Sequence, residues 1–476
     1  MTALNDGIAW LDDIVWSEYL LIPLLLLAGL YLTFLLRGIQ FHRLGYALWM
    51  ALFKRKEGGA DGDISHYQAL SMALAATVGV GNIAGVGLAI GIGGPGALFW
   101  MWMTGLVGMA TKYSEAFLGV RFRTKSAIGR QAGGPMYYLN QIRFKKLGAV
   151  LAVMFAVFGV LASFGIGNMS QSNAVATAAS DEWGVPAWAT GLIITVLAAT
   201  VIIGGVKVIG RVASAFVPVM IVVYILGACW VLIANAQAIP GAFGLIFTEA
   251  FTGPAGVGGA AGSALFIAIQ QGVARGIFSN ESGLGTGGIA AAAAQTSQPV
   301  RQALVSMTQT FIDTLVVVTF TGLVVVVSGA YKLVTPGDYD TSLAGEALTR
   351  EAFSKGLPGD WGGIIVGLGL IFFAFTTLLG WSYYGERCIE RLTGGKTPLY
   401  IYKLVFIVLI FVGTVANLEQ IITFSDLMNG LMALPNLIGL LLLSPLVYRE
   451  TRAFFRRPDW KLMSPVDSVT IEKPAS

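Results

Sequence analysis

A glycine-rich run with one amide side chain interrupts an apolar stretch early in the chain. From Ala75 to Met103 the sequence reads AATVGVGNIAGVGLAIGIGGPGALFWMWM, with eight glycines and Asn82 among them. Each glycine costs a helix about 1 kcal/mol relative to alanine, and hydrocarbon penalises an unpaired amide. Non-helical backbone at membrane depth is tolerated only inside protein or at a cavity, where it can bind ions and solutes. The run therefore predicts a broken membrane helix, non-helical at 79–82, that forms a binding site.

A second glycine-rich run, RGIFSNESGLGTGG at 275–288, carries charges as well. We expect a second break, with non-helical backbone at 276–280. Ionisable residues inside apolar spans are costly and are functional candidates. Arg275 could pair with Glu281 across the break or with Asp313 in the following span, and Asp313 could equally serve ion coupling.

Two further ionisable residues, Lys112 and Glu115, lie three positions apart in another apolar span. Residues at that spacing face each other on a helix, which predicts an ion pair. Their place toward one end of the span favours a structural or gating pair over a binding role.

The composition is that of an integral membrane protein. The 476 residues are 55% hydrophobic and 12% charged, with a mean hydropathy of +0.74, whereas soluble domains are about 25% charged. The acidic N-terminus is not typical of a secretory signal, and the two cysteines and two histidines indicate neither a disulfide framework nor a metal site. The sequence shows no nucleophile–base set and no GxxxxGK[ST] loop, which argues against an enzyme and an ATP-driven pump. It also shows no filter-like re-entrant segment typical of a channel.

Eleven apolar segments are long enough to span a bilayer. Two of them, 147–178 and 262–294, exceed the usual length, and the second contains the run at 275–288. The expected spans are 19–36, 68–92, 97–120, 147–178, 186–205, 212–235, 262–294, 302–328, 362–385, 399–416 and 424–447.

Basic residues concentrate in alternate loops between these spans. If the N-terminus lies outside, 25 of the 30 Lys and Arg residues fall in inward segments and three in outward ones. Cytoplasmic loops of membrane proteins carry such an excess. The pattern predicts an extracytoplasmic N-terminus and a cytoplasmic C-terminus.

The two glycine-rich runs lie in the second and seventh spans, five spans apart. An odd offset makes these spans antiparallel, as in the inverted repeats of transporters. We expect an all-α integral membrane protein of eleven transmembrane helices, with one extra N-terminal helix before a 5+5 inverted repeat that holds two broken helices. The expected parts are an N-terminal region with the extra helix and a cytoplasmic loop (1–66), a first repeat (67–236), an extracytoplasmic loop (237–261), a second repeat (262–447) and a cytoplasmic tail (448–476).

Five motifs resemble one family of secondary transporters. They are GVGNIAGV (79–86), GGPGALFWMW (93–102), GMATKYSE (108–115), GGPMYYL (133–139) and RGIFSNESGLGTGG (275–288), and the resemblance covers nearly the whole chain in order. The family is the alanine or glycine:cation symporters (sodium:alanine symporters), whose fold is similar to that of the bacterial leucine transporter. The resemblance implies uptake of alanine or glycine through a cell membrane by alternating access, with sodium as coupling ion, no cofactor, no nucleic acid and no obligate protein partner. The residues alone leave a sodium- or proton-coupled symporter of another small solute as the alternative.

A zwitterionic amino acid needs donors for its carboxylate and acceptors for its ammonium group. A helix N-terminus offers free N–H groups and a positive dipole end, and carbonyls freed at the two breaks would accept from the ammonium. Gln171 could donate to the carboxylate or merely end a helix, and the glycines could instead allow close helix packing. The candidate substrate residues are Thr77, Gly79, Gly81, Asn82, Gln171, Gly276, Ile277, Phe278 and Ser279, with Phe278 as a wall that limits substrate size.

Thr376 and Thr377, in FFAFTTLLG, place two neighbouring hydroxyls in the ninth span. In folds like that of the leucine transporter, such a pair binds sodium with carbonyls of the first core helix, which the resemblance assigns here to Ala75 and Val78. The hydroxyls could instead bond to carbonyls of their own helix. The same resemblance offers two residues, Thr77 and Asn82, as ligands of a possible second sodium.

Overall fold

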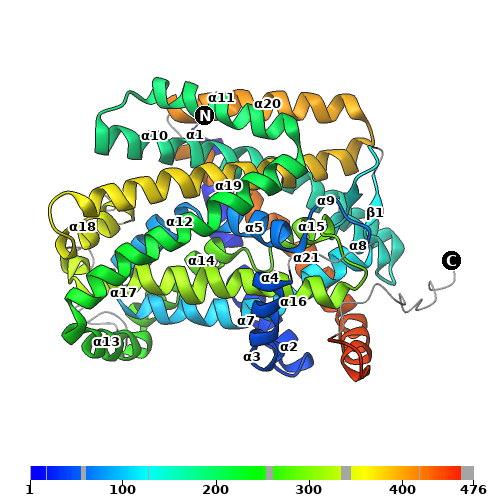
Figure 1. Cartoon of the computed structure of the whole chain (residues 1–476), viewed down its shortest axis with the longest axis horizontal. Coiled ribbons are helices and arrows are strands. Elements are labelled where there is room, and N and C mark those ends of the chain that lie inside the picture. Colours follow the sequence, from blue (N-terminus) through cyan, green and yellow to red (C-terminus); the bar gives the residue numbers. More distant parts are fainter. Residues whose placement is uncertain are drawn as a thin grey trace.

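The computed structural model describes residues 2–17, 19–54, 60–126, 128–252, 261–333, 345–416 and 419–461, most of which are helical. Several of its long helices run roughly along the long axis of the molecule, and others cross them obliquely (Figure 1). Two short strands, β1 (Thr124–Lys125) and β2 (Gln131–Ala132), form an antiparallel hairpin.

The α-helices are α1 (Thr2–Val15), α2 (Leu21–Leu35), α3 (Ile39–His42), α4 (Leu44–Phe53), α5 (His66–Thr77), α6 (Val86–Gly93), α7 (Gly96–Arg121), α8 (Pro135–Tyr138), α9 (Lys145–Phe164), α10 (Ser170–Trp183), α11 (Ala187–Gly204), α12 (Val206–Ala234), α13 (Ile239–Thr252), α14 (Ala261–Asn280), α15 (Thr286–Ala292), α16 (Pro299–Thr310), α17 (Thr319–Val327), α18 (Glu346–Gly356), α19 (Trp361–Thr393), α20 (Lys396–Val415) and α21 (Glu419–Arg456). Three π-helical segments join consecutive helices, namely η1 (Gly81–Gly85), η3 (Gly165–Met169) and η5 (Phe311–Val318). Short 3₁₀ turns are η2 (Leu139–Gln141), η4 (Ala236–Ala238) and η6 (Ala330–Leu333).

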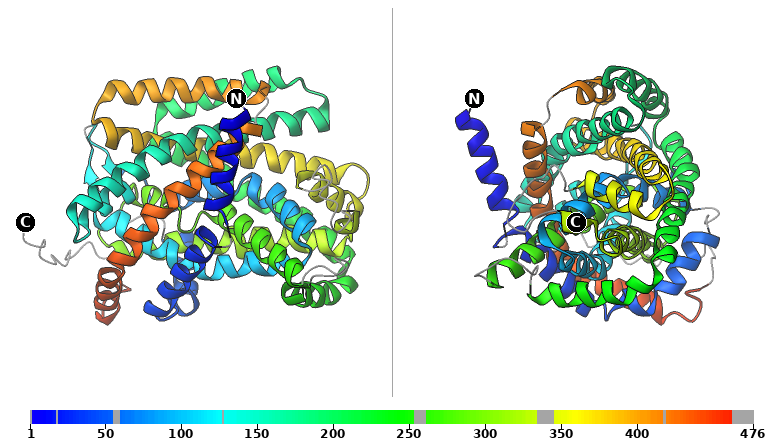
Figure 2. Two further views of the ribbon diagram at one scale, coloured as in Figure 1. Left: turned by 180° about the vertical axis from the view of Figure 1, so that it is seen from behind. Right: turned by 90° about the vertical axis from the view of Figure 1, so that its left-hand side faces the viewer.

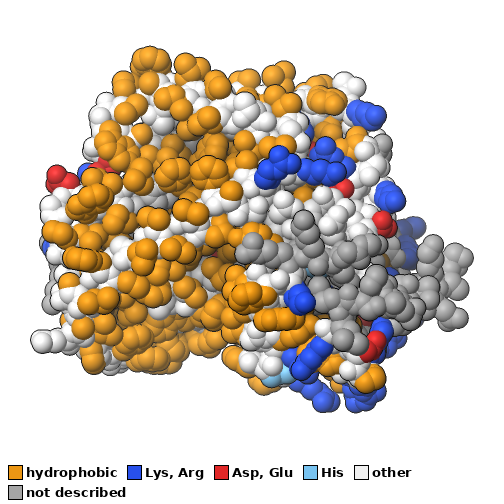
Figure 3. Space-filling model, in the orientation of Figure 1, with side chains coloured by type: hydrophobic (Ala, Val, Ile, Leu, Met, Phe, Trp, Pro, Cys, Tyr) orange, Lys and Arg blue, Asp and Glu red, His pale blue; other side chains and the backbone are white. Residues whose placement is uncertain are grey.

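The outer surface of the bundle is apolar. Leu192 on α11, Val219 on α12 and Leu404 on α20 are all more than half exposed. Figure 3 shows hydrophobic side chains over much of this face, with Lys and Arg side chains gathered toward one end. An apolar surface of this extent is unfavourable in water and favourable in hydrocarbon, so the protein crosses a membrane with several helices.

Among the described residues, seven helices are long and apolar enough to span a bilayer, and a bent pair made of α5 and the η1–α6 segment gives an eighth. This confirms the all-helical membrane class. The other predicted spans coincide with α2, which has only 15 residues, with α7 and with α14–α15. The total of eleven spans stays a prediction.

The first predicted break is present, but it is shorter than expected. α5 ends at Thr77, residues 78–79 leave the helix, and the two halves meet at an angle of 55°. Asn82 accepts a hydrogen bond from the Gly79 amide at 2.9 Å, which allows the helix to restart directly after the break. The predicted non-helical segment 79–82 is therefore correct at Gly79 and wrong at 80–82, which belong to the next helix.

The second break lies beyond its predicted position. α14 continues through 276–280, and the chain leaves the helix only at Glu281. Glu281 has a φ of +55°, and Gly283 and Gly285 have φ values of +102° and +92°. This left-handed backbone favours glycine, so the later glycines of the run make the break and the helix at 276–280 is intact.

Gly276, which we expected to break the helix, allows close packing instead. A Cβ atom at this position would collide with the Thr104 hydroxyl and lie 3.1 Å from the Cα of Met101, both on α7. The alternative interpretation, that a small residue lets two membrane helices approach, holds at this position.

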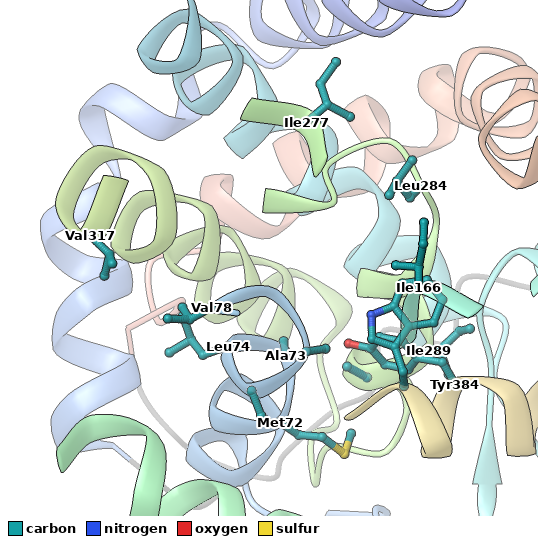
Figure 4. Close-up of a cluster of buried hydrophobic side chains, with 14 of the residues drawn as sticks. Met72, Ala73, Leu74, Val78, Ile166, Ile277, Leu284, Ile289, Val317 and Tyr384 are labelled. Atoms are coloured by element: carbon teal, nitrogen blue, oxygen red, sulfur yellow. The ribbon is translucent and has the colours of Figure 1, made fainter. Parts of the chain in front are cut away.

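Helices from the two halves of the chain surround both breaks. α14 packs against α7 and α6, and α19 packs against α5 and α10 (Figure 2). In Figure 4, Leu74 on α5 and Val78 just after it lie between Val317 on one side and a group with Ile166 and Tyr384 on the other. These apolar side chains shield the backbone groups of the first break from water.

Candidate substrate and ion site

A small cavity lies where the first break faces the end of α14. Its volume is about 20 Å³, which is room for about one water molecule. Its wall is formed by Ala76, Thr77, Gly79, Val80 and Gly81 at the first break, Ile166 and Gln171 near η3, Phe278 and Glu281 at the end of α14, Thr377 and Trp381 on α19, and Asn429 on α21.

The cavity brings together several residues that the sequence suggested separately. Of the predicted substrate residues, Thr77, Gly79, Gly81, Gln171 and Phe278 line it, as do Thr377, proposed for sodium, and Glu281, proposed as a charge partner. Four other candidates, Asn82, Gly276, Ile277 and Ser279, lie outside its wall. Sequence reasoning missed Ala76, Val80, Ile166, Trp381 and Asn429. Asn429 could have been noticed as an amide within an apolar span, whereas nothing in the sequence singles out Trp381.

One side of the cavity offers hydrogen-bond donors. The amides of Val80 and Gly81 belong to the first turn of a helix, where N–H groups have no acceptor within the helix. A Cβ atom on Gly81 would lie 3.2 Å from the Cα of Ser279 and 3.4 Å from the Phe278 ring. A bare backbone at a helix start, with its positive dipole end, suits a carboxylate.

The cavity wall also offers hydrogen-bond acceptors. Gln171 donates its amide to the Ile166 carbonyl at 3.0 Å, and its buried Oε1 has no partner among the described residues. The same holds for the buried Oδ1 of Asn429. Glu281 accepts a hydrogen bond from Thr286 at 2.7 Å. We expected Gln171 to donate to a carboxylate; one of its two amide N–H groups goes to Ile166, and its unpartnered Oε1 can also accept from an ammonium group.

Behind the cavity, a buried carboxylate joins three elements. Asp313 in η5 accepts from Asn82 at 2.8 Å, from Ser279 at 2.9 Å and from Thr314 at 2.8 Å. Gln309 donates to the Thr77 hydroxyl at 2.9 Å. Both polar ends of the Asn82 side chain are therefore engaged, one with the Gly79 amide and one with Asp313.

Arg275 does not take either of its predicted partners. Among the described residues it forms no ion pair with Glu281 or Asp313; the charges around those carboxylates include Lys112 instead. The charge of Arg275 instead lies near Asp12 of α1 and lowers the pKa of that carboxyl group. Burial, and then the charges of Asp426 and Asp13, outweigh this effect and raise the pKa of Asp12 to about 7. Arg275 is thus directed toward α1 and α21, because its place on α14 turns it away from the break.

The two threonines of α19 behave differently. The Thr377 hydroxyl donates to the Ala75 carbonyl of α5 at 2.9 Å and lies 2.5 Å from a Cβ atom placed on Gly79. The Thr376 hydroxyl donates to Phe373 of its own helix at 3.0 Å. Thr377 thus meets the carbonyl that the resemblance named, whereas Thr376 follows the alternative of a bond within its own helix.

Lys112 and Glu115 bind the second break rather than each other. Lys112 donates to the Glu281 carbonyl at 3.1 Å. Glu115 accepts from the amides of Gly283 and Gly285 at 2.9 and 3.0 Å. The predicted direct ion pair is absent among the described residues, because both side chains serve the backbone of the break.

The whole chain can be compared with known proteins. A model of the sodium:alanine symporter family matches residues 1–467. The sodium/alanine symporter AgcS of Methanococcus maripaludis is 50% identical over 444 residues, which cover 93% of this chain and 95% of that protein. The chain belongs to the sodium:alanine symporter family.

More distant relatives carry other names. The probable sodium/glutamine symporter GlnT of Bacillus subtilis is 38% identical over 456 residues, 95% of this chain and 90% of that protein. The amino-acid carrier protein AlsT of the same organism is 35% identical over 450 residues, with 94% and 91% covered. Among solved structures, a mutant manganese transporter of Eremococcus coleocola aligns with a TM-score of 0.48 and 13% identity, covering 82% of this chain and 88% of that one.

Family membership confirms the resemblance seen in the motifs. The protein is a sodium-coupled symporter of small amino acids and not an enzyme. Five of the nine candidate substrate residues line one cavity of this symporter.

Proposed function

We propose that this protein takes up alanine and glycine together with sodium through the cell membrane, by alternating access. The proposal rests on one observation, a cavity lined by two residues at a helix start and by two buried side chains whose amide oxygens have no partner among the described residues. A zwitterionic amino acid fits such a cavity, because its carboxylate needs donors and its ammonium group needs acceptors. Relatives named for sodium/alanine and sodium/glutamine symport support a substrate of this class.

In the proposed complex, the substrate carboxylate binds the amides of Val80 and Gly81. The ammonium group donates to Gln171 and Asn429, and Glu281 supplies negative charge nearby. Phe278 limits the side chain of the substrate, because each added methylene in a filled pocket raises the cost of packing. Three of the candidates act from behind the wall: Ser279 through Asp313, and Gly276 and Ile277 by fixing the end of α14.

Sodium, in this proposal, binds between α5 and α19. Thr377 and the Ala75 carbonyl already face each other at 2.9 Å. The Val78 carbonyl and the Thr376 hydroxyl would complete the oxygen ligands, the latter after leaving Phe373. A second sodium would bind Thr77 and Asn82, with Asp313 as the nearest negative charge.

We further propose that eleven helices cross the membrane, with the N-terminus outside and the C-terminus in the cytoplasm. The excess of Lys and Arg in alternate loops supports this orientation. The proposed repeats at 67–236 and 262–447 each begin with a helix that is interrupted, α5 to α6 in the first and α14 to α15 in the second. Opposite directions of these two helices would make the repeat inverted.

Uptake by the purified protein in sealed vesicles tests the proposal. With an inward sodium gradient and no ATP, labelled alanine should accumulate above its outside concentration, and potassium in place of sodium should abolish accumulation. Accumulation driven by a pH gradient alone would favour the proton-coupled alternative, and entry without accumulation would indicate a channel.

The cavity itself is tested with two matched variants. Gln171→Ala should weaken alanine binding about tenfold or more, since it removes an acceptor for a charged group. Asn173→Ala should leave binding unchanged, because Asn173 lies two residues away and donates to Gly413 outside the cavity wall. If both variants change the affinity for alanine equally, Gln171 is not part of the substrate site.

A further inference from the structure

A basic pocket lies at the opposite end of α21 from Asn429, where the end of α2 meets α21. Its volume is about 340 Å³. None of its ten lining residues is acidic, and half of them are basic or can become so. The ten are Arg37, His42, Arg43, Arg452 and Arg456, together with Leu36, Ile39, Tyr448, Thr451 and Phe455.

Two arginines of this basic pocket, Arg43 and Arg452, lie against aromatic rings. The Arg43 guanidinium lies 4.5 Å from the centre of the Phe455 ring and 4.8 Å from that of Trp460, and its buried Nε has no partner among the described residues. Arg452 donates to the Tyr448 hydroxyl at 3.4 Å. Contacts of this kind orient the positive charge without neutralising it.

The acidic residues closest in sequence are already engaged elsewhere. Glu450 accepts from Arg121 at 3.1 Å, and Asp459 pairs with Arg457 at 3.2 Å. The basic pocket therefore keeps its positive charge, and hydroxyl groups at Tyr448 and Thr451 add neutral hydrogen-bonding partners. A group with several negative oxygens fits this chemistry.

An apolar stripe on α2 leads to the basic pocket. Leu27, Leu30 and Phe34 are 62%, 42% and 74% exposed, at spacings that place them on one side of the helix. Phe41, just beyond, is 64% exposed. The Tyr31 hydroxyl lies 3.1 Å from that of Ser444, which holds α2 against α21 and keeps the stripe next to the pocket.

We propose that the basic pocket binds the phosphate headgroup of an anionic phospholipid, with the acyl chains along the apolar stripe of α2. Basic pockets between membrane helices bind such headgroups, and Figure 3 shows Lys and Arg side chains gathered at the end of the molecule where α2, α3 and the end of α21 lie in Figure 1. The stripe distinguishes a lipid from a free phosphate compound, because a soluble phosphate leaves it unused.

Native mass spectrometry of the full-length protein in detergent tests this site, with dioleoylphosphatidylglycerol and dioleoylphosphatidylcholine as probes. One Lys or Arg near an anionic lipid contributes about fivefold in affinity, so Arg43→Gln with Arg456→Gln should weaken phosphatidylglycerol binding by about 25-fold. Binding of phosphatidylcholine should change little. Lys207→Gln with Arg211→Gln, which removes two exposed charges on α12, is the matched control and should retain the preference.

Glycerol 3-phosphate serves as the soluble competitor. It should displace the lipid only at concentrations far above those of the lipid, and Leu30→Ser with Phe34→Ser should weaken lipid binding but not glycerol 3-phosphate binding. The proposal fails if the Arg43/Arg456 variant keeps its preference for phosphatidylglycerol, or if glycerol 3-phosphate binds as tightly as the lipid.

Discussion

The two helix breaks of this symporter differ in what their backbone amides meet. At the second break, the free amides of Gly283 and Gly285 are occupied by the Glu115 carboxylate from α7. At the first break, the Gly79 amide donates to the Asn82 side chain, and Val80 and Gly81, at the start of the next helix, line the cavity. The protein supplies a resident carboxylate at one break and leaves the equivalent place open at the other.

The second break is also braced from several directions. Asn436 donates to Glu115 at 2.9 Å and to the Gly283 carbonyl at 2.7 Å, and Tyr138 donates to Asn436. Lys112 holds the Glu281 carbonyl. We infer that the two breaks have different roles. The second break is fixed by side chains of the protein, and the first can bind and release a substrate carboxylate.

Access to the first break is restricted by α18, which packs against η1 and α6. Thr349 on α18 donates to the Ile83 carbonyl at 2.9 Å. A Cβ atom on Gly87 would collide with the carbonyl of Gly345, just before α18. The close contact between α6 and the start of α18 therefore depends on the missing side chain of Gly87. A substrate that binds the first break from this side must therefore pass α18.

The largest effect is expected from removal of the resident anion. Glu115→Ala leaves the buried amides of Gly283 and Gly285 and the Asn436 side chain without their acceptor, and loss of one member of a buried charged group costs about 3–5 kcal/mol. The variant should unfold at a much lower temperature in detergent and yield little folded protein. Glu351→Ala, which breaks an exposed pair with Lys355, should cost about 0.5 kcal/mol or less. Equal thermal stability of the two variants would contradict the role of Glu115.

The next largest effect is expected when the open break is filled. Gly81→Val should reduce alanine binding by about 100-fold or more, because its side chain would cover the amides and press on Phe278 and Ser279. Gly85→Ala, in the same π-helical segment, is the control, since a Cβ atom there meets nothing within 4 Å. Competition binding with labelled alanine separates them, and retained binding in Gly81→Val would remove the first break from the site.

Sequence reasoning found the first break more accurately than the second, for a physical reason. In the first run, the two polar side chains, Thr77 and Asn82, lie on either side of the break at 78–79 and mark its position. In RGIFSNESGLG, polar residues precede the break, because Ser279 bonds to Asp313 and Asn280 to Thr314 from within the intact helix. Those partners are distant in the sequence, and so is Glu115. The sequence therefore predicted which spans are broken, but not which backbone groups stay free.

A smaller effect is expected at the proposed sodium site. Thr377→Ala should raise the sodium concentration for half-maximal uptake by about tenfold, because it removes an oxygen that faces the Ala75 carbonyl. Thr376→Val should raise it less, since that hydroxyl bonds to its own helix. The double variant should need a higher sodium concentration for half-maximal uptake than either single variant. Sodium titrations of alanine uptake test this order, with Ser382→Ala, another hydroxyl bonded within α19, as control. An unchanged sodium dependence in the double variant would place the ion elsewhere.

The smallest effect concerns the helix that covers the first break. Burial, Asp181 and Glu182 raise the pKa of Glu346 at the start of α18 from 4.5 to about 7, although Arg350 lowers it. Because the docked helix holds this proton more tightly than an undocked one, docking of α18 is favoured at low pH. That contribution is full below about pH 4.5 and is lost as the pH rises through about 7. Hydrogen exchange of the α18 amides, corrected for the intrinsic rate, should show less protection at pH 8 than at pH 6. Glu346→Gln should remove this difference, because the amide is neutral at both values. If the wild-type protein shows equal protection at both, Glu346 does not control how α18 closes over the first break.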